Sequence, residues 1–91
     1  MRVTVKVGEP LRSAVGSRKV TWELPDDATV ADLLSSLAAR YPRFRHEFYQ
    51  REIDLPYVLF LNDDQVKSGE VEKTPVSEGD TFFIFLPVAG G

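Results

Sequence analysis

The sequence predicts an α+β fold in which one main helix lies across a mixed sheet of about five strands. Three observations predict it. Apolar and polar residues alternate near the start of the chain, apolar residues recur at helical spacing over 30–41, and two short apolar runs follow, 58–61 and 81–86. Alternation favours half-buried strands, whereas spacings of three and four residues favour an amphipathic helix. A chain of 91 residues is one domain.

The composition excludes several classes of function. There is no cysteine, which excludes a disulfide scaffold, a thiolate zinc site and a cysteine nucleophile. The net charge is −3, from 14 acidic and 11 basic residues, whereas nucleic-acid binding usually requires clustered positive charge. No apolar run has the length of a membrane span, and the first residues lack the pattern of a signal peptide. We therefore expect a cytoplasmic protein that binds neither nucleic acid nor membrane.

The first half of the chain predicts a hairpin followed by the main helix. Residues 3–7 and 20–24 each alternate apolar and polar side chains, and a loop rich in glycine and proline joins them. Thr29 precedes Asp32 by three residues, which is the spacing of a capping box, so the helix is expected to begin there. Pro42 ends it, because the residue before a proline is disfavoured in a helix.

The second half predicts the remaining strands. Within 43–56, two phenylalanines four residues apart indicate a short helical turn whose role stays open. The runs 58–61 and 81–86 are expected to be the third and last strands, with a short return strand near Val66 and an irregular stretch over 67–77. The order strand, strand, helix, strand, short strand, strand corresponds to a β-grasp arrangement.

The chain divides into a β-grasp domain, 1–86, and an extended tail, 87–91. Pro87 marks the end of the last strand, because proline cannot donate to a strand ladder. Gly90 and Gly91 have no Cβ atoms, so they can enter a narrow channel in a partner protein. A terminal carboxylate is ionised at neutral pH and can attack the α-phosphate of ATP when a partner supplies magnesium. The resulting acyl-adenylate is activated toward a sulfur or nitrogen nucleophile.

Four segments carry a resemblance to a known family: the helix start Thr29-Val30-Ala31-Asp32-Leu33-Leu34, the strand Val58-Leu59-Phe60-Leu61-Asn62, the turn Pro75-Val76-Ser77-Glu78-Gly79-Asp80, and the end Phe85-Leu86-Pro87-Val88-Ala89-Gly90-Gly91. Through these segments, and over nearly its whole length, the chain resembles the MoaD/ThiS family of ubiquitin-like sulfur carriers. The resemblance implies a ubiquitin-like fold and a terminal Gly91 that is adenylated and then carries sulfur as a thiocarboxylate. The tail that threads into a partner's site would consist of Pro87, Val88, Ala89 and Gly90.

The resemblance also implies a set of partners. An adenylating enzyme of the ubiquitin-activating type uses ATP and magnesium, a sulfurtransferase delivers the sulfur, and a synthase subunit receives it. The acceptor of the sulfur would be a molybdopterin precursor, a thiazole precursor, an activated serine derivative or a tRNA base. Within the family, this chain resembles the small subunit of molybdopterin synthase most. The domain alone is expected to bind no metal or cofactor and to catalyse nothing. Two alternatives stay open: a covalent protein modifier joined through Gly91, and a non-covalent β-grasp adaptor.

A candidate docking patch is predicted beside the tail. Alternation places Phe83 and Phe85 together on one face of the last strand, and Phe60 and Val58 on one face of the third. Because a single helix covers only one face of a sheet, we expect these four side chains to be exposed and to contact partner enzymes. The alternative is that 43–56 folds over this face and buries it.

Overall fold

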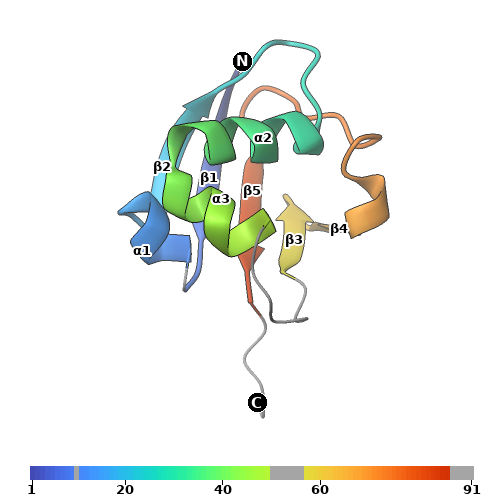
Figure 1. Ribbon diagram of the computed structural model, residues 1–91. Coiled ribbons are helices and arrows are strands. Elements are labelled where there is room, and N and C mark those ends of the chain that lie inside the picture. Colours follow the sequence, from blue (N-terminus) through green and yellow to red (C-terminus); the bar gives the residue numbers. More distant parts are fainter. Residues whose placement is uncertain (10, 50–56, 87–91) are drawn as a thin grey trace.

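A computed structural model describes residues 1–9, 11–49 and 57–86. It contains a mixed five-stranded sheet in the order β2-β1-β5-β3-β4, with α2 and α3 on one face (Figure 1). The elements are β1 (Arg2–Val7), α1 (Leu11–Val15), β2 (Lys19–Glu23), α2 (Val30–Arg40), α3 (Pro42–Tyr49), β3 (Val58–Leu61), β4 (Asp64–Val66), a 3₁₀ turn η1 (Ser68–Glu70) and β5 (Thr81–Phe85). Among the described strands, β1 and β5 pair in parallel and the other neighbours pair antiparallel. The predicted α+β, β-grasp fold is confirmed.

Helix α2 begins at the predicted capping box. The hydroxyl of Thr29 accepts a hydrogen bond from the amide of Asp32 at 3.3 Å, and the carboxylate of Asp32 accepts one from the amide of Thr29 at 2.9 Å. The next two amides, of Val30 and Ala31, donate to backbone carbonyls in the segment after β4. These bonds satisfy donors that a helix start leaves unpaired, and they anchor the irregular segment 67–77 to α2.

The core lies between the sheet and the helices. Its largest fully buried side chains come from all three helices and from strands β1 and β5: Phe44, Phe82, Leu11, Leu33, Leu37, Ile84, Val3, Val5 and Val30. They belong to one cluster with the other buried apolar residues. The predicted loop between the first two strands is wrong over 11–15, which form α1. Leu11 and Val15 lie one helical turn apart and are both buried, so this short helix is stabilised by its contact with the core.

The described part of the segment 43–56 is α3, which confirms the predicted short helical turn. Phe44 is fully buried in the core, so α3 packs on the same side of the sheet as α2. This part of the segment therefore leaves the opposite face of the sheet uncovered, in contrast to the alternative that it folds over that face. Residues 50–56 lie outside the described residues.

The turn between β3 and β4 depends on Asn62. Its φ is +57°, a left-handed conformation that non-glycine residues seldom adopt. Its side-chain oxygen accepts a hydrogen bond from the amide of Thr81 at 2.9 Å, and its side-chain nitrogen donates to Asp80 at 3.1 Å. Asn62 thus joins this turn to the start of β5.

We expect Asn62→Ala to lower the free energy of unfolding by about 1–3 kcal/mol, because alanine loses both side-chain bonds and is strained at positive φ. Asn62→Gly is the matched comparison: it loses the same bonds but tolerates the backbone conformation, so its loss should be smaller. Urea denaturation measures both values. An alanine variant as stable as the unmodified chain would contradict this role.

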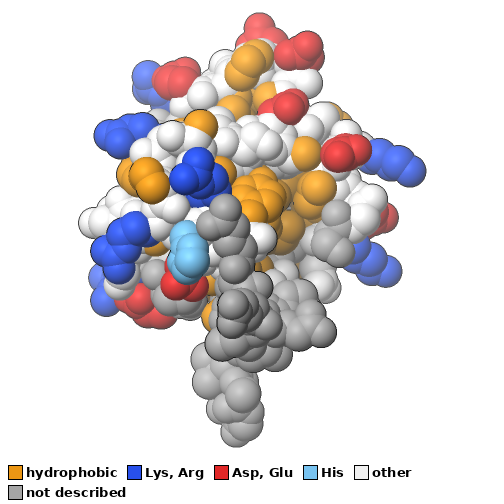
Figure 2. All heavy atoms as spheres, viewed as in Figure 1, with side chains coloured by type: hydrophobic (Ala, Val, Ile, Leu, Met, Phe, Trp, Pro, Cys, Tyr) orange, Lys and Arg blue, Asp and Glu red, His pale blue; other side chains and the backbone are white. Residues whose placement is uncertain are grey.

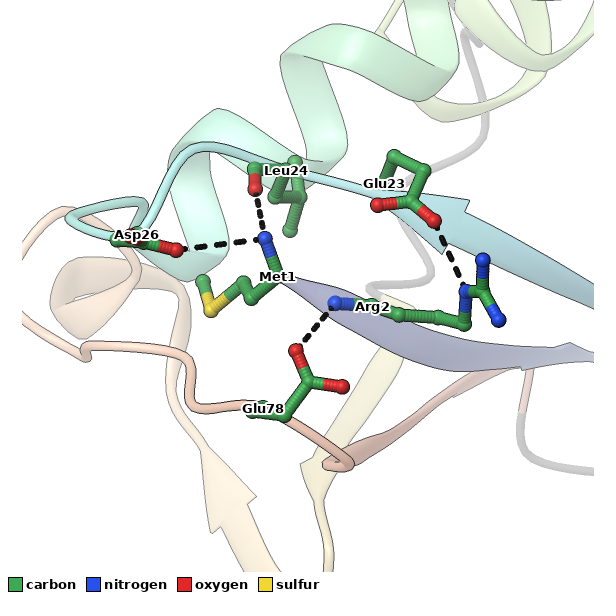
Figure 3. A network of polar contacts seen from close by, with 6 residues as sticks. All are labelled: Met1, Arg2, Glu23, Leu24, Asp26 and Glu78. Carbon is green, nitrogen blue, oxygen red and sulfur yellow. Dashed lines mark hydrogen bonds and ion pairs between the residues drawn. The ribbon is translucent and has the colours of Figure 1, made fainter.

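A group of polar contacts fixes the end of the sheet where β1 begins (Figure 3). The amino group of Met1 donates to the carbonyl of Leu24 at 2.6 Å. The amide of Arg2 donates to Glu78 at 2.8 Å, and its guanidinium donates to Glu23 at 2.9 Å. The hydrogen bond and the charge of Glu23 raise the pKa of Arg2. Together these contacts connect the turn before β5 to the β1–β2 hairpin.

Candidate functional site

The sheet face opposite α2 and α3 carries the predicted docking residues. The strand register places Phe83 beside both Phe60 and Lys6, and Phe85 beside Val58. The rings of Phe60 and Phe85 are stacked, with their centroids 6.3 Å apart. Paired positions point to the same face of a sheet, so these side chains form one continuous surface. We call Val58, Phe60, Phe83 and Phe85 the apolar patch.

The apolar patch is half-buried. Each of its four residues is partly accessible, so the expectation that they are exposed is only partly correct. Neighbouring side chains on adjacent strands cover part of one another, as the stacked rings show. The surface that they leave accessible is apolar and aromatic, a composition typical of protein–protein contacts.

Basic side chains border the apolar patch on its β1 side. The ammonium group of Lys6 lies 5.1 Å from the centroid of the Phe83 ring, within the range of a cation–π interaction. A shallow hollow of about 300 Å³ lies at this border, and Lys6, Arg18, Phe83 and Phe85 are among the residues that line it. A partner that fills this hollow would meet aromatic and cationic groups together.

Gly8 forms part of the same hollow and lies close against β5. Its amide donates to the carbonyl of Ile84 at 3.0 Å, and a Cβ atom added to it would lie 3.0 Å from the Cβ of Phe85. The absence of a side chain therefore lets the segment after β1 approach the end of β5 closely.

The sequence analysis did not identify Lys6 or Arg18 as part of this surface. Alternation along β1 does predict that Lys6 faces away from the core. Its position next to Phe83 follows only from the parallel pairing of β1 with β5, the first and last strands of the chain.

The predicted tail, 87–91, with Gly90 and Gly91, lies outside the described residues. The structure places the strand that leads to it: β5 ends at Phe85, and Leu86 is the last described residue. Phe83 and Phe85 of the apolar patch thus lie on the strand that precedes the predicted tail in the sequence.

The helix-covered face has a different character. Figure 2 shows hydrophobic side chains gathered over the region between α2 and β3 on this face. A hollow of about 350 Å³ lies there, lined in part by Leu34, Phe48, Tyr49 and Leu59.

Within the described ranges, no three or more histidine, cysteine, aspartate or glutamate side chains are grouped so that they could hold a metal ion. In the same ranges, no helix is long and apolar enough to span a membrane.

The mixed β-grasp sheet, with Phe83 and Phe85 of the apolar patch on its last strand, defines a ubiquitin-like protein, a class that does not catalyse reactions on its own. Comparison with known proteins agrees. The model of the ThiS family matches residues 5–91, and the chain belongs to this family of MoaD/ThiS ubiquitin-like proteins. It is similar to small archaeal modifier protein 3 of Haloferax volcanii, with 33% identity over 92 aligned positions that cover 100% of both chains.

Solved structures have the same fold. A Pyrococcus furiosus protein described as molybdopterin converting factor subunit 1 matches with a TM-score of 0.75 and 26% identity, covering 97% of this chain and 99% of that one. A chain of the BexX/CysO complex of Amycolatopsis orientalis matches with a TM-score of 0.74 and 26% identity, covering 98% of this chain and 99% of that one.

Proposed function

We propose that this protein is a sulfur carrier whose Gly91 carboxylate is adenylated and then converted to a thiocarboxylate. The observation that carries the proposal is the family match, which extends through the Gly90-Gly91 pair to the last residue. The chain has no cysteine on which sulfur could travel as a persulfide, so the terminal carbonyl is the group available to hold it.

The chemistry takes place in two steps at the carboxyl group of Gly91. A carboxylate oxygen of Gly91 attacks the α-phosphorus of ATP, pyrophosphate leaves, and the acyl-adenylate forms. A hydrosulfide equivalent from a sulfurtransferase then attacks the carbonyl carbon, and AMP leaves with one of the original carboxylate oxygens. ATP and magnesium belong to the activating partner; this chain supplies only the reacting carboxylate. Because this activation requires ATP, we place the carrier in the cytoplasm.

The apolar patch has the docking role in this proposal. Its rings are partly accessible and border the hollow lined by Lys6 and Arg18. A partner that presents apolar side chains flanked by carboxylates would match this surface in both shape and charge. The Amycolatopsis relative is described in a complex with a second protein, BexX, which supports a role that depends on protein partners. Those proposed here are an adenylating enzyme, a sulfurtransferase and a sulfur-accepting synthase subunit.

The comparisons support a second candidate function. The 33% identity to a small archaeal modifier protein favours covalent attachment of Gly91 to lysine amines of other proteins. That function begins with the same adenylation and differs only in the nucleophile that attacks the acyl-adenylate. The Pyrococcus relative favours molybdopterin synthesis as the destination when the nucleophile is sulfur.

Intact-mass spectrometry tests the proposal. After incubation with an adenylating enzyme of the family, magnesium-ATP and a sulfur source, we expect the mass to rise by the difference between one sulfur and one oxygen atom. The same reaction without ATP should leave the mass unchanged. A modifier would instead give higher-mass conjugates in a denaturing blot of cell lysate. A chain that shows neither product under these conditions contradicts both functions.

A further inference from the structure

Strand β2 forms one edge of the sheet, so one side of its backbone faces away from the other strands. Just before β2, the carbonyl of Arg18 accepts a hydrogen bond from the amide of Val7 in β1. Just after β2, the amide of Leu24 donates to the carbonyl of Met1, the residue before β1. Hydrogen-bonded positions alternate along an antiparallel pair. The N–H and C=O groups of Lys19, Thr21 and Glu23 therefore point outward, away from β1.

One of these three outward positions is occupied within the chain. The hydroxyl of Ser17 donates to the carbonyl of Lys19 at 2.9 Å and accepts a hydrogen bond from its amide at 3.3 Å. Among the described residues, no hydrogen bond engages the outward backbone groups of Thr21 and Glu23. Such unpaired groups on an edge strand can pair with a further strand. The other edge strand, β4, has only three residues.

The sequence of β2 is complementary to itself when two copies run antiparallel. In a pairing centred on Thr21, Lys19 lies opposite the second copy's Glu23, Val20 lies opposite its Trp22, and Thr21 lies opposite Thr21. These are opposite-charge, aromatic–β-branched and Thr–Thr pairs, three kinds of cross-strand contact that stabilise antiparallel sheets. We propose that β2 is the interface for a second copy of this chain, in a symmetric dimer that joins the two sheets edge to edge.

The side chains of β2 are placed for this contact. Lys19, Thr21 and Glu23 are exposed on the open face of the sheet, and Arg2 holds Glu23 there through a 2.9 Å hydrogen bond (Figure 3). On the other face, the indole of Trp22 donates to the hydroxyl of Ser36 at 2.7 Å, so its orientation is set before association. Pairing thus requires little rearrangement beyond breaking the two hydrogen bonds between the Ser17 hydroxyl and the backbone of Lys19.

The dimer leaves the apolar patch available, because β1 lies between β2 and β5 in the sheet. The contact uses the same strand of both copies, so it closes with two chains and does not extend into a filament. It is one strand wide and smaller than a standard protein interface, so association is expected only at high protein concentration. This inference does not depend on the proposed function.

Two charge-reversal variants test the register. Lys19→Glu and Glu23→Lys each place like charges opposite one another twice, so each variant alone should associate about tenfold or more weakly than the unmodified chain. Mixed in equal amounts, the two variants place a carboxylate opposite an ammonium group at every charged position. Sedimentation equilibrium at low salt should therefore show that the mixture associates at least as well as the unmodified chain.

Two further variants test the backbone pairing. Thr21→Pro removes the central outward N–H without removing a bond to β1, so it should fold and stay monomeric. Ser17→Ala releases the backbone of Lys19 and should strengthen the dimer. An unmodified chain that stays monomeric at millimolar concentration overturns the inference, even if β2 binds an extended peptide instead. Folded charge variants whose mixture associates no better than either alone also overturn it.

Discussion

Removal of Gly91 alone is expected to abolish both the sulfur-dependent gain in mass and every conjugate formed through the end of the chain. The carboxylate would then belong to Gly90, about 3.3–3.6 Å short of its former position along an extended tail. A misplacement of only about 1 Å can cost an active site about 10²-fold in rate. Pyrophosphate release with the adenylating enzyme measures the first step directly.

Two further tail variants accompany this deletion, one as a second test and one as a control. Gly90→Val keeps the length of the chain but adds a branched side chain that a narrow channel excludes, so it should also fail at adenylation. Ala89→Gly keeps both the length and the final glycine pair and should react like the unmodified chain. Equal melting temperatures would show that the domain is unaffected. A shortened chain that still gains sulfur would refute the assignment of Gly91.

Phe85→Asp should weaken binding to the adenylating enzyme by about 30-fold or more, the effect of losing an aromatic hot spot worth at least about 2 kcal/mol. Phe85 stacks on Phe60 and lines the hollow that also contains Lys6 and Arg18. Aspartate would remove this apolar surface and place an unpaired carboxylate in the contact. Isothermal titration calorimetry measures the affinity.

Tyr49→Asp is the matched control for this substitution. Tyr49 is an aromatic residue with 51% of its surface exposed, and it lies on α3, on the opposite side of the sheet. Its replacement should leave the affinity unchanged. Lys6→Glu separates docking from folding, because Lys6 is exposed: this variant should slow association, and added salt should reduce the difference. Equal losses of affinity for Phe85→Asp and Tyr49→Asp would contradict the location of the docking surface.

The elements predicted correctly from the sequence are those with strong local patterns. Thr29 and Asp32 form the capping box that their spacing indicates, because both partners lie within one helical turn. Helix α1 was missed because a helix of five residues is too short to be stable alone. Leu11 and Val15 gain their stabilisation from the core, which no local pattern reveals.

The candidate site was predictable to a similar extent. Alternation correctly assigned Phe83 and Phe85 to one face of the last strand. The reactive terminus expected from the glycine pair stays a prediction, because 87–91 lie outside the described residues. The contribution of Lys6 was not predictable, because it depends on a parallel pairing between strands at opposite ends of the chain. The half-burial of the apolar patch likewise depends on which strands lie beside β5.

The sequence by itself thus determined which side chains share a face and where α2 begins. These features follow from the repeat of strand and helix geometry, which acts over a few residues. The tertiary structure alone decided the strand order, and with it the contact of Lys6 with Phe83 and the exposed edge of β2. Pairing between distant strands is selected by the apolar surface that the whole sheet and its helices bury together, and that quantity belongs to no single segment.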